Sequence, residues 1–439
     1  MSVTGLPEEV WYHVFEFLSP PDKLSVRASC KFFKRVIDRP GLWRNSTVYL
    51  EKITSYKSHF WRTLSKRKTN SVVVLKASGV REWTELGCRL PWLASLTIQV
   101  CGDPEALGTL RRLNKLKRLE IRQCRCPSLA ASLPSLLQLT HIGICEVVCA
   151  PRTDIINAVS QLPNLTSLHY HESNKPIPKA ALHKILRCLP NLKHLSLKMG
   201  ANQSPLPCDY FCPAKANQMS GEPVCGALGL TSLELLNYMD PMLSPVALQG
   251  LPSLKSLTVQ YRGWTLDSSL CHLKTWLSML PLLSELSISL GYQLGAYANS
   301  VPGTVQSLSL KGVVGELKAL WEMAQKVPDL LCLHLDLCCH ERHSFIAEVP
   351  QLFPKLQILK IRHHNVPETE FLQLSQMSYL KCVEVLDPHN LSPNSALMDL
   401  THKLHIQTNN RVHVIYSSEP KDRNVCFCAK SCFNFSVPP

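Results

Sequence analysis

The sequence predicts an α/β solenoid, a curved parallel sheet with helices on its convex side, preceded by a small all-α module. Three observations predict this fold. A short pattern, apolar-x-x-apolar-x-apolar, returns twelve times along the 439-residue chain. Segments with helical apolar spacing separate several of these copies. The first 44 residues lack the pattern and have a helical organisation of their own. The chain exceeds the roughly 250–300 residues at which single cores stop growing, whereas a repeat array grows linearly.

The repeat pattern begins at twelve apolar residues with a mean spacing of about 26, inside the 20–29 residues typical of leucine-rich repeats. They are Leu93, Leu116, Leu139, Leu165, Leu192, Leu230, Leu254, Leu283, Val305, Leu330, Leu356 and Leu380. In Leu-x-x-Leu-x-Leu the last two apolar residues alternate as on a short strand, and the first closes the turn into it. Strands of successive repeats then pair side by side, so the sequence predicts a leucine-rich-repeat solenoid.

The elements between and around the repeats follow from the same patterns. Helical apolar spacing predicts convex-side helices over residues 177–189, 266–280 and 314–327. Proline after a helix-ending leucine fits this assignment, because the ring cannot continue a helix. We expect Ser71–Lys76 to be the strand that starts the array and Arg411–Ile415 the strand that closes it.

The domain organisation that we predict has four parts. An N-terminal module covers residues 2–48 and a helical linker residues 49–70. The solenoid of about 12–13 repeats covers residues 71–416, with a surface insertion at 201–226 that is rich in Pro, Ser, Asn and Gly. Residues 417–439 are predicted to be a disordered tail.

The N-terminal module has the pattern of two helices separated by a Pro20-Pro21 break. The first helix carries Val10, Val14, Phe15 and Leu18. The second is predicted from Asp22 to Asp38, with Asp22 placed as its N-cap. A unit of this size is below what usually folds alone, so it should pack against the repeats or a partner.

The module resembles the F-box family. The matching landmarks, in order and spacing, are Leu6-Pro7-Glu8-Glu9-Val10, Val14-Phe15-Glu16-Phe17-Leu18, Asp22-Lys23-Leu24, Cys30-Lys31-Phe32-Phe33-Lys34-Arg35 and Leu42-Trp43-Arg44. Val14, Ser29 and Phe33 depart from the family pattern, where isoleucine, valine and tryptophan are usual. Ser29 places a polar group at a normally apolar position, which would weaken docking slightly.

F-box modules followed by leucine-rich repeats are substrate receptors of SCF ubiquitin ligases, and the resemblance covers essentially the whole chain. It implies that the module docks on the SCF adaptor subunit and, through it, joins the cullin scaffold and RING subunit. The repeats would select the protein to be ubiquitylated. The residues expected on the adaptor are Leu6, Pro7, Val10, Val14, Leu18, Leu24 and Val26. The alternative is that they form only the core of the module itself.

Basic and histidine side chains fall on concave positions of the early predicted strands. They are Arg118, Arg122, His169, His171, His194 and Lys198. Arginine forms charge-assisted, often bidentate bonds with anionic groups, so this wall would suit an acidic or phosphorylated protein segment. The alternative is an ordinary solvated sheet face. We find no nucleophile elbow, phosphate-cradling glycine loop or metalloprotease helix, so the sequence predicts a non-catalytic protein with no cofactor.

Charge and cysteine content limit the remaining possibilities. The net charge is +14, and residues 1–70 hold 13 Lys and Arg against 6 Asp and Glu. This charge motivates a second hypothesis, a leucine-rich-repeat scaffold or nucleic-acid-associated protein outside ubiquitin transfer. Lys66-Arg67-Lys68 is shorter than the usual basic patch of 5–8 residues, and we expect a solvated loop edge there. We therefore do not expect nucleic acid as a partner.

The start of the chain lacks a signal-peptide pattern, and no apolar stretch approaches the roughly 20 residues needed to span a bilayer. The 19 cysteines are accordingly expected to be mostly reduced thiols of a cytoplasmic or nuclear protein. Cys208, Cys212 and Cys225 lack a paired fourth ligand for zinc. Cys426, Cys428 and Cys432 are expected to be thiols of a frayed tail. No metal is predicted.

Overall fold

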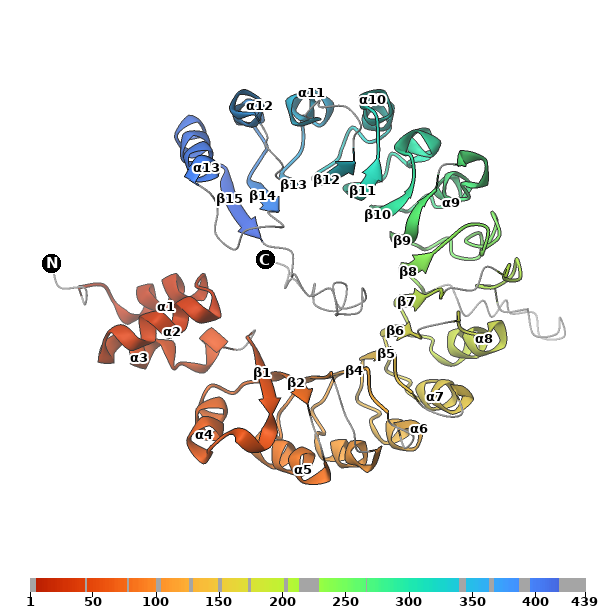
Figure 1. Cartoon of the computed structure of the whole chain (residues 1–439). Coiled ribbons are helices and arrows are strands. Elements are labelled where there is room, and N and C mark those ends of the chain that lie inside the picture. The colour runs from red at the N-terminus through yellow and green to blue at the C-terminus, as the bar shows by residue number, and fades with distance from the viewer. Residues whose placement is uncertain are drawn as a thin grey trace. The chain divides into compact units, whose positions relative to one another are not determined.

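The computed structural model describes residues 5–43, 46–76, 79–99, 104–125, 129–148, 152–172, 175–200, 204–212, 229–265, 267–338, 345–362, 367–386 and 395–417. The chain forms two compact units, Met1–Glu172 and Ser173–Pro439, each taken by itself below. In both units the strands pair in parallel in chain order, and the helices that alternate with the strands lie on one side of them (Figure 1). Within the described residues no helix is long and apolar enough to cross a membrane.

In its described residues 5–43 the N-terminal module contains helices and no strand. Its elements are α1 (Glu8–Glu16), α2 (Pro20–Ser29), α3 (Lys31–Ile37) and the 3-10 helix η1 (Pro40–Trp43). The second predicted helix is therefore wrong in two respects. Ser19, not Asp22, caps α2 by accepting a hydrogen bond from the Asp22 amide, because Pro20 and Pro21 fit the first helical turn. The helix also breaks at Cys30, whose extended backbone separates α2 from α3.

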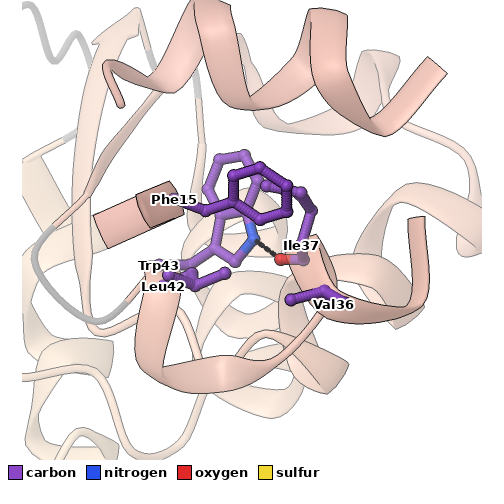
Figure 2. Close-up of a cluster of buried hydrophobic side chains, with 5 residues drawn as sticks. All are labelled: Phe15, Val36, Ile37, Leu42 and Trp43. Carbon is purple, nitrogen blue, oxygen red and sulfur yellow. Dashed lines mark hydrogen bonds between the residues drawn. The ribbon is translucent and has the colours of Figure 1, made fainter. Parts of the chain in front are cut away.

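The core of the module is a cluster of five buried residues, Phe15, Val36, Ile37, Leu42 and Trp43 (Figure 2). The Trp43 indole donates a hydrogen bond of 2.5 Å to the Ile37 carbonyl, which satisfies its only polar atom inside the cluster. Trp11, Phe32 and Phe33 are partly buried against it. The core thus joins α1, α3 and η1.

The described residues of the first unit continue with six parallel strands in chain order. The strands are β1 (Thr47–Lys52), β2 (Ser71–Lys76), β3 (Ser95–Ile98), β4 (Arg118–Arg122), β5 (His141–Cys145) and β6 (Ser167–His171). Between them lie η2 (Ile53–Ser55), α4 (Ser58–Lys66), α5 (Val80–Arg89), η3 (Pro104–Arg112), α6 (Leu129–Ser132), η4 (Leu133–Ser135) and α7 (Arg152–Val159).

The sheet starts one strand earlier than the sequence pattern indicates. Residues 49–70 are not a purely helical linker, because β1 overlaps their start and pairs with β2. Of the six β1 residues only Leu50 is buried, and Tyr49 is 55% exposed. A single inward-facing apolar residue gives too little alternation for the strand to be recognised in the sequence.

The second unit contains nine strands in its described residues, again parallel and in chain order. They are β7 (His194–Lys198), β8 (Ser232–Tyr238), β9 (Ser256–Thr265), β10 (Glu285–Tyr292), β11 (Ser307–Val314), β12 (Cys332–Cys338), β13 (Ile358–Arg362), β14 (Cys382–Leu386) and β15 (His413–Ser417). The α-helices are α8 (Lys179–Cys188), α9 (Leu273–Ser278), α10 (Leu317–Lys326), α11 (Val349–Leu352), α12 (Glu368–Gln373) and α13 (Ser395–Gln407). The 3-10 helices are η5 (Ser268–Leu270), η6 (Leu294–Ala296), η7 (Ala298–Ser300), η8 (Phe345–Glu348) and η9 (Leu374–Gln376).

The predicted repeat register is confirmed. All twelve apolar residues that begin a repeat are buried, with at most 3% of their surface exposed. At each of them a strand starts two residues later, as β4 does after Leu116 and β10 after Leu283. The helices predicted at 177–189 and 314–327 are α8 and α10. The one predicted at 266–280 is shorter, because only Leu273–Ser278 is α-helical.

The strands β8 to β11 are seven to ten residues long, whereas most others have four to six. Register shifts interrupt their pairing, and Leu290, Gly291 and Gly312 have positive φ angles. At Gly291 a Cβ atom would lie 2.4 Å from the Tyr261 ring, so glycine is required there. A bulge gives each strand extra length without disturbing the buried repeat positions.

Part of the predicted surface insertion is packed into the fold. Tyr210 and Phe211 are fully buried, and the Tyr210 hydroxyl donates a hydrogen bond of 2.7 Å to the Ile177 carbonyl. Lys179 of α8 forms an ion pair with Asp209. Tyr210 and Phe211 therefore belong to the core, whereas Ser204, Pro205, Pro207 and Cys208 of the same segment are exposed, as predicted for a surface insertion. The rest of the insertion, Arg44, Cys225, and Cys426, Cys428 and Cys432 of the tail lie outside the described residues.

Candidate functional site

The N-terminal module presents large apolar side chains to solvent on α1 and α2. The exposed fractions are 50% for Leu6, 41% for Val10, 45% for Val14 and 51% for Leu24. Pro7 is exposed as well. Isolated exposed apolar residues are common, but several gathered on a unit of this size indicate an interaction surface. We call Leu6, Pro7, Val10, Val14, Phe17 and Leu24 the apolar face of the module.

Phe17 is a member of this face that the sequence analysis did not assign, and it is 89% exposed. Val10, Val14 and Phe17 follow one another at spacings of four and three, which places them on one side of a helix. Trp11 and Phe15 occupy the other side, where their rings lie 5.6 Å apart and contact Phe33. The spacing of Phe17 from Val10 and Val14 was the signal that could have identified it.

Leu18 and Val26 differ from the other five expected adaptor contacts. Both are half-buried and pack against the internal cluster of the module. Their position means that a substitution at either residue would disturb the core as well as the surface. The seven residues named from the sequence therefore comprise five surface positions and two that support the fold.

A buried ion-pair network joins the module to the first repeat. Asp38 at the end of α3 accepts bonds of 2.8 and 3.0 Å from Arg27, and a bond of 3.0 Å from Arg67, which follows α4. Arg67 also lies 3.7 Å above the Trp43 ring. Burial alone would raise the pKa of Asp38, but the two arginines outweigh it and hold the pKa below its usual value.

In the first unit, the predicted substrate contacts Arg118 and Arg122 lie on β4. Arg118 is half-buried, whereas Arg122 is buried and forms an ion pair of 2.8 Å with Glu120. Burial raises the pKa of Glu120 despite this partner. A basic residue neutralised in this way presents less positive charge to an acidic ligand than the sequence pattern suggests.

His169 and His171, also predicted substrate contacts, occupy β6 in register with this region. The strand pairing aligns Glu120 with Gly143 and His169, and aligns Arg122 with Cys145 and His171. Both histidines are buried, and their rings lie 5.9 Å apart. The structure thus places four of the predicted contacts on β4 and β6, the two strands that flank β5 in the first unit.

In the second unit, His194 and Lys198 lie on β7 and are half-buried. The His194 Nδ1 atom is 2.7 Å from the Ser232 hydroxyl. Burial lowers the pKa of His194 to about 4. The imidazole is therefore neutral at pH 7 and can offer a substrate hydrogen bonds but no charge.

The later strands of this unit pair their basic residues with carboxylates. Arg362 lies 3.0 Å from Asp336 and Lys360 lies 2.6 Å from Glu384, each on the neighbouring strand. His334 is in register with Lys360, and burial together with the nearby cations lowers its pKa to about 3. The sheet face here is polar, but its charges largely cancel.

The lowered pKa values of His194 and His334 predict that the folded protein loses stability in acid. In the unfolded chain the two histidines should titrate near 6.5, whereas in the folded protein they stay neutral to about pH 4 and pH 3. The unfolded state therefore binds more protons, and the stability present above pH 6.5 falls as the pH drops towards 4. For His194 the expected loss at pH 5 is about 2 kcal/mol.

Urea unfolding of the whole chain between pH 4 and 8 measures this loss. His194→Asn should flatten the pH dependence, because the variant lacks the imidazole that takes up a proton on unfolding. If the free energy of unfolding changes equally with pH in His194→Asn and in the parent protein, the pKa of His194 is not lowered by folding.

Comparison with known proteins identifies the N-terminal module. Residues 3–48 match the model of the F-box-like family. No curated protein sequence matches the chain. Three solved structures illustrate its partial likeness to other proteins: a TLR13 complex with ssRNA13, the complex of Rad7 and Elc1 in yeast, and internalin C2 from Listeria monocytogenes.

The structural similarities are low. The TLR13 complex has a TM-score of 0.40 at 16% identity, covering 86% of this chain and 59% of the TLR13 chain. The Rad7 and Elc1 complex has a TM-score of 0.39 at 12% identity, covering 66% and 82%. Internalin C2 has 0.26 at 16% identity, covering 52% and 74%. The assignment of the strands to leucine-rich repeats depends on the strand register and the leucine pattern of this chain, and not on these structures. Residues 3–48 belong to the F-box-like family, and the strands that follow them form a leucine-rich-repeat solenoid.

Proposed function

We propose that the chain is the substrate-recognition subunit of an SCF-type ubiquitin ligase, acting in the cytoplasm or nucleus. The module would dock on the SCF adaptor subunit, which links it to the cullin scaffold and RING subunit. The repeats would bind the protein to be ubiquitylated. The chain would contribute positioning, which raises the effective concentration of substrate lysines near the conjugating enzyme, and no catalytic group.

The observation that carries the proposal is the apolar face of an F-box-like module. The core already contains the aromatic and aliphatic residues that the module needs, namely the five-residue cluster around Trp43. The apolar face is additional to that core, and a partner that covers it would gain the free energy of burying large apolar side chains. A few such anchors usually dominate the affinity of an interface.

For substrate, the early strands support a segment rich in hydrogen-bonding and acidic groups. Arg118 on β4 of the first unit and Lys198 on β7 of the second are half-buried basic side chains of the kind that an acidic or phosphorylated segment would contact. Arg122, His169, His171 and His194 are better suited to hydrogen bonding, since Arg122 is paired and His194 is neutral at pH 7. Which residues touch substrate remains part of the proposal.

Co-expression with the SCF adaptor subunit tests the docking step. The proposal expects a stable complex with one copy of each chain that persists at high salt, because its contacts are apolar. The second step is proximity labelling with and without proteasome inhibition, in which substrates accumulate only under inhibition. An adaptor-free chain that instead binds RNA with strong salt dependence would support the alternative, a nucleic-acid-associated repeat protein motivated by the charge of +14.

A further inference from the structure

An open depression in the surface, called the cavity below, lies beside the F-box-like module, where the module meets the first repeat. Its volume is about 430 Å³. The lining residues come from the start of α1, from α3 and the turn after it, and from the end of α4: Glu8, Arg35, Asp38, Arg39, Pro40 and Lys66. Three of the six are basic. None of the residues of the apolar face lines this cavity.

Both carboxylates in the lining are already held by arginines. Glu8 forms ion pairs of 3.2 Å with Arg35 and 2.7 Å with Arg39. Asp38 is held by Arg27 and Arg67, which lie outside the cavity lining. These two carboxylates therefore have little capacity to neutralise a further cation.

Lys66 and the exposed parts of the Arg35 and Arg39 side chains are accessible to a ligand. The Arg35 and Arg39 side chains are 67% and 42% exposed, so part of each guanidinium still faces solvent. Lys66 is exposed, and no carboxylate of the described residues lies within 4.0 Å of its ammonium group. The lining residues alone carry a net charge of +1. Arg27 and Arg67, which hold Asp38 from outside the lining, bring the local net charge to +3.

We propose that this cavity binds a phosphate group, with Arg35, Arg39 and Lys66 as its donors. Arginine and lysine form short, charge-assisted bonds with phosphate oxygens, and three donors from two separate elements match an acceptor with three or more oxygens. Arg35 and Arg39 already hold one carboxylate, Glu8, so the phosphate would bind to their remaining donors. A dianion would compensate most of the remaining charge.

The site also gives a role to the basic run Lys66-Arg67-Lys68. Its three residues have different environments: Lys66 lines the cavity, Arg67 is buried between Asp38 and Trp43, and Lys68 is exposed in the following turn. A phosphate that bridges α3 and Lys66 would connect the module to α4 of the first repeat. Because it binds only the folded state, it would raise the melting temperature of the chain.

The phosphate could be inorganic or carried by a phosphorylated serine of another protein. Calorimetric titration of the full chain with inorganic phosphate, with a blocked phosphoserine and with the same blocked serine lacking the phosphate separates these sources. Saturable binding of one or both phosphate probes, at millimolar or tighter affinity and without binding of plain serine, is the expected result. Tighter binding of inorganic phosphate would identify the free ion as the ligand, and tighter binding of the blocked phosphoserine would identify a phosphorylated serine of another protein.

Lys66→Glu and Lys68→Glu form a matched pair, because both make the same charge change within one basic run at exposed positions. Lys66→Glu should weaken phosphate binding at least about tenfold and Lys68→Glu less than about twofold, since only the first removes a donor. Arg35→Gln should also weaken it. Equal weakening by the two lysine variants would indicate general attraction to a basic surface and would overturn the proposal, as would titrations that show no saturation.

Discussion

Leu24→Asp is expected to abolish capture of the SCF adaptor subunit while leaving the chain folded. Leu24 is 51% exposed on α2, so a carboxylate there remains hydrated in the isolated protein. In a complex that covers the apolar face, the same carboxylate would be buried without a partner. Loss of an apolar anchor at an interface usually costs about 2–4 kcal/mol, which corresponds to a decrease in affinity of roughly 30-fold to 1000-fold.

The matched control is Leu282→Asp, because Leu282 is 52% exposed but lies in the second unit, outside the module. Co-purification should retain the adaptor with this variant and lose it with Leu24→Asp, and both variants should melt like the parent protein. Leu18→Asp is less informative, since Leu18 packs against the core of the module. Full adaptor binding by Leu24→Asp would show that the apolar face is not the docking surface.

The repeat architecture could be predicted from the sequence because its determinants are local and periodic. Leu116, Leu254 and Leu356 show no measurable exposure, and in each case the strand starts at the predicted distance. One buried apolar residue stands two positions before each of these strands and so marks where the strand begins. Because the same spacing occurs twelve times, each copy supports the assignment of the others. The predicted position of α8 followed from the same reasoning, since Leu182, Ile185 and Leu186 are buried.

Elements outside this periodicity could not be recognised. β1 buries only Leu50, so its sequence does not alternate. The break between α2 and α3 lies at Cys30, whose backbone is extended. No proline or glycine stands next to Cys30, so the sequence contains no helix-breaking residue that would predict the break. The long strands β9 to β11 depend on Gly291 and Gly312, whose role is visible only when Tyr261 and Leu290 are seen against them.

The sequence indicated which residues to consider for the candidate site, but not which of them are exposed, ion-paired or protonated. The pattern named Val10, Val14 and Leu24, which are exposed, together with Leu18 and Val26, which pack against the core. It could not distinguish the two groups, because both are apolar residues at helical spacing. For the basic residues it could not show pairing or protonation. Burial keeps His194 neutral at pH 7, and Glu120 neutralises Arg122 through a contact two residues away.

The way the module is attached to the repeats decides whether docking on an adaptor can position a substrate. A flexible connection would spread the substrate over a large volume, whereas a fixed one pre-organises it. Within the first unit, the Arg27–Asp38–Arg67 network provides such a fixed connection, with the Arg67 side chain only 9% exposed and Asp38 11% exposed. Arg67 also lies above Trp43, so the network extends into the core of the module.

Asp38→Ala is therefore expected to destabilise the first unit strongly. It leaves Arg67 buried without its carboxylate, and breaking a buried ion pair from one side typically costs about 3–5 kcal/mol. The pKa of Asp38 is lowered in the folded state, so its contribution is present above the unfolded value near 3.9 and is lost as the pH falls through the folded value. Urea unfolding at pH 7 should show the full effect, and the difference from the parent protein should shrink below pH 4.

The double variant Asp38→Ala with Arg67→Met separates charge burial from lost packing. Methionine keeps much of the length of Arg67 beside Trp43 without leaving a charge, so the double variant should be more stable than Asp38→Ala alone. If Asp38→Ala costs less than about 1 kcal/mol, or if adding Arg67→Met destabilises it further, the network does not hold the module on the first repeat. Adaptor capture by Asp38→Ala at low temperature should remain, because the apolar face lies on α1 and α2, while ubiquitin transfer to a bound substrate should fall as the module loses its fixed position.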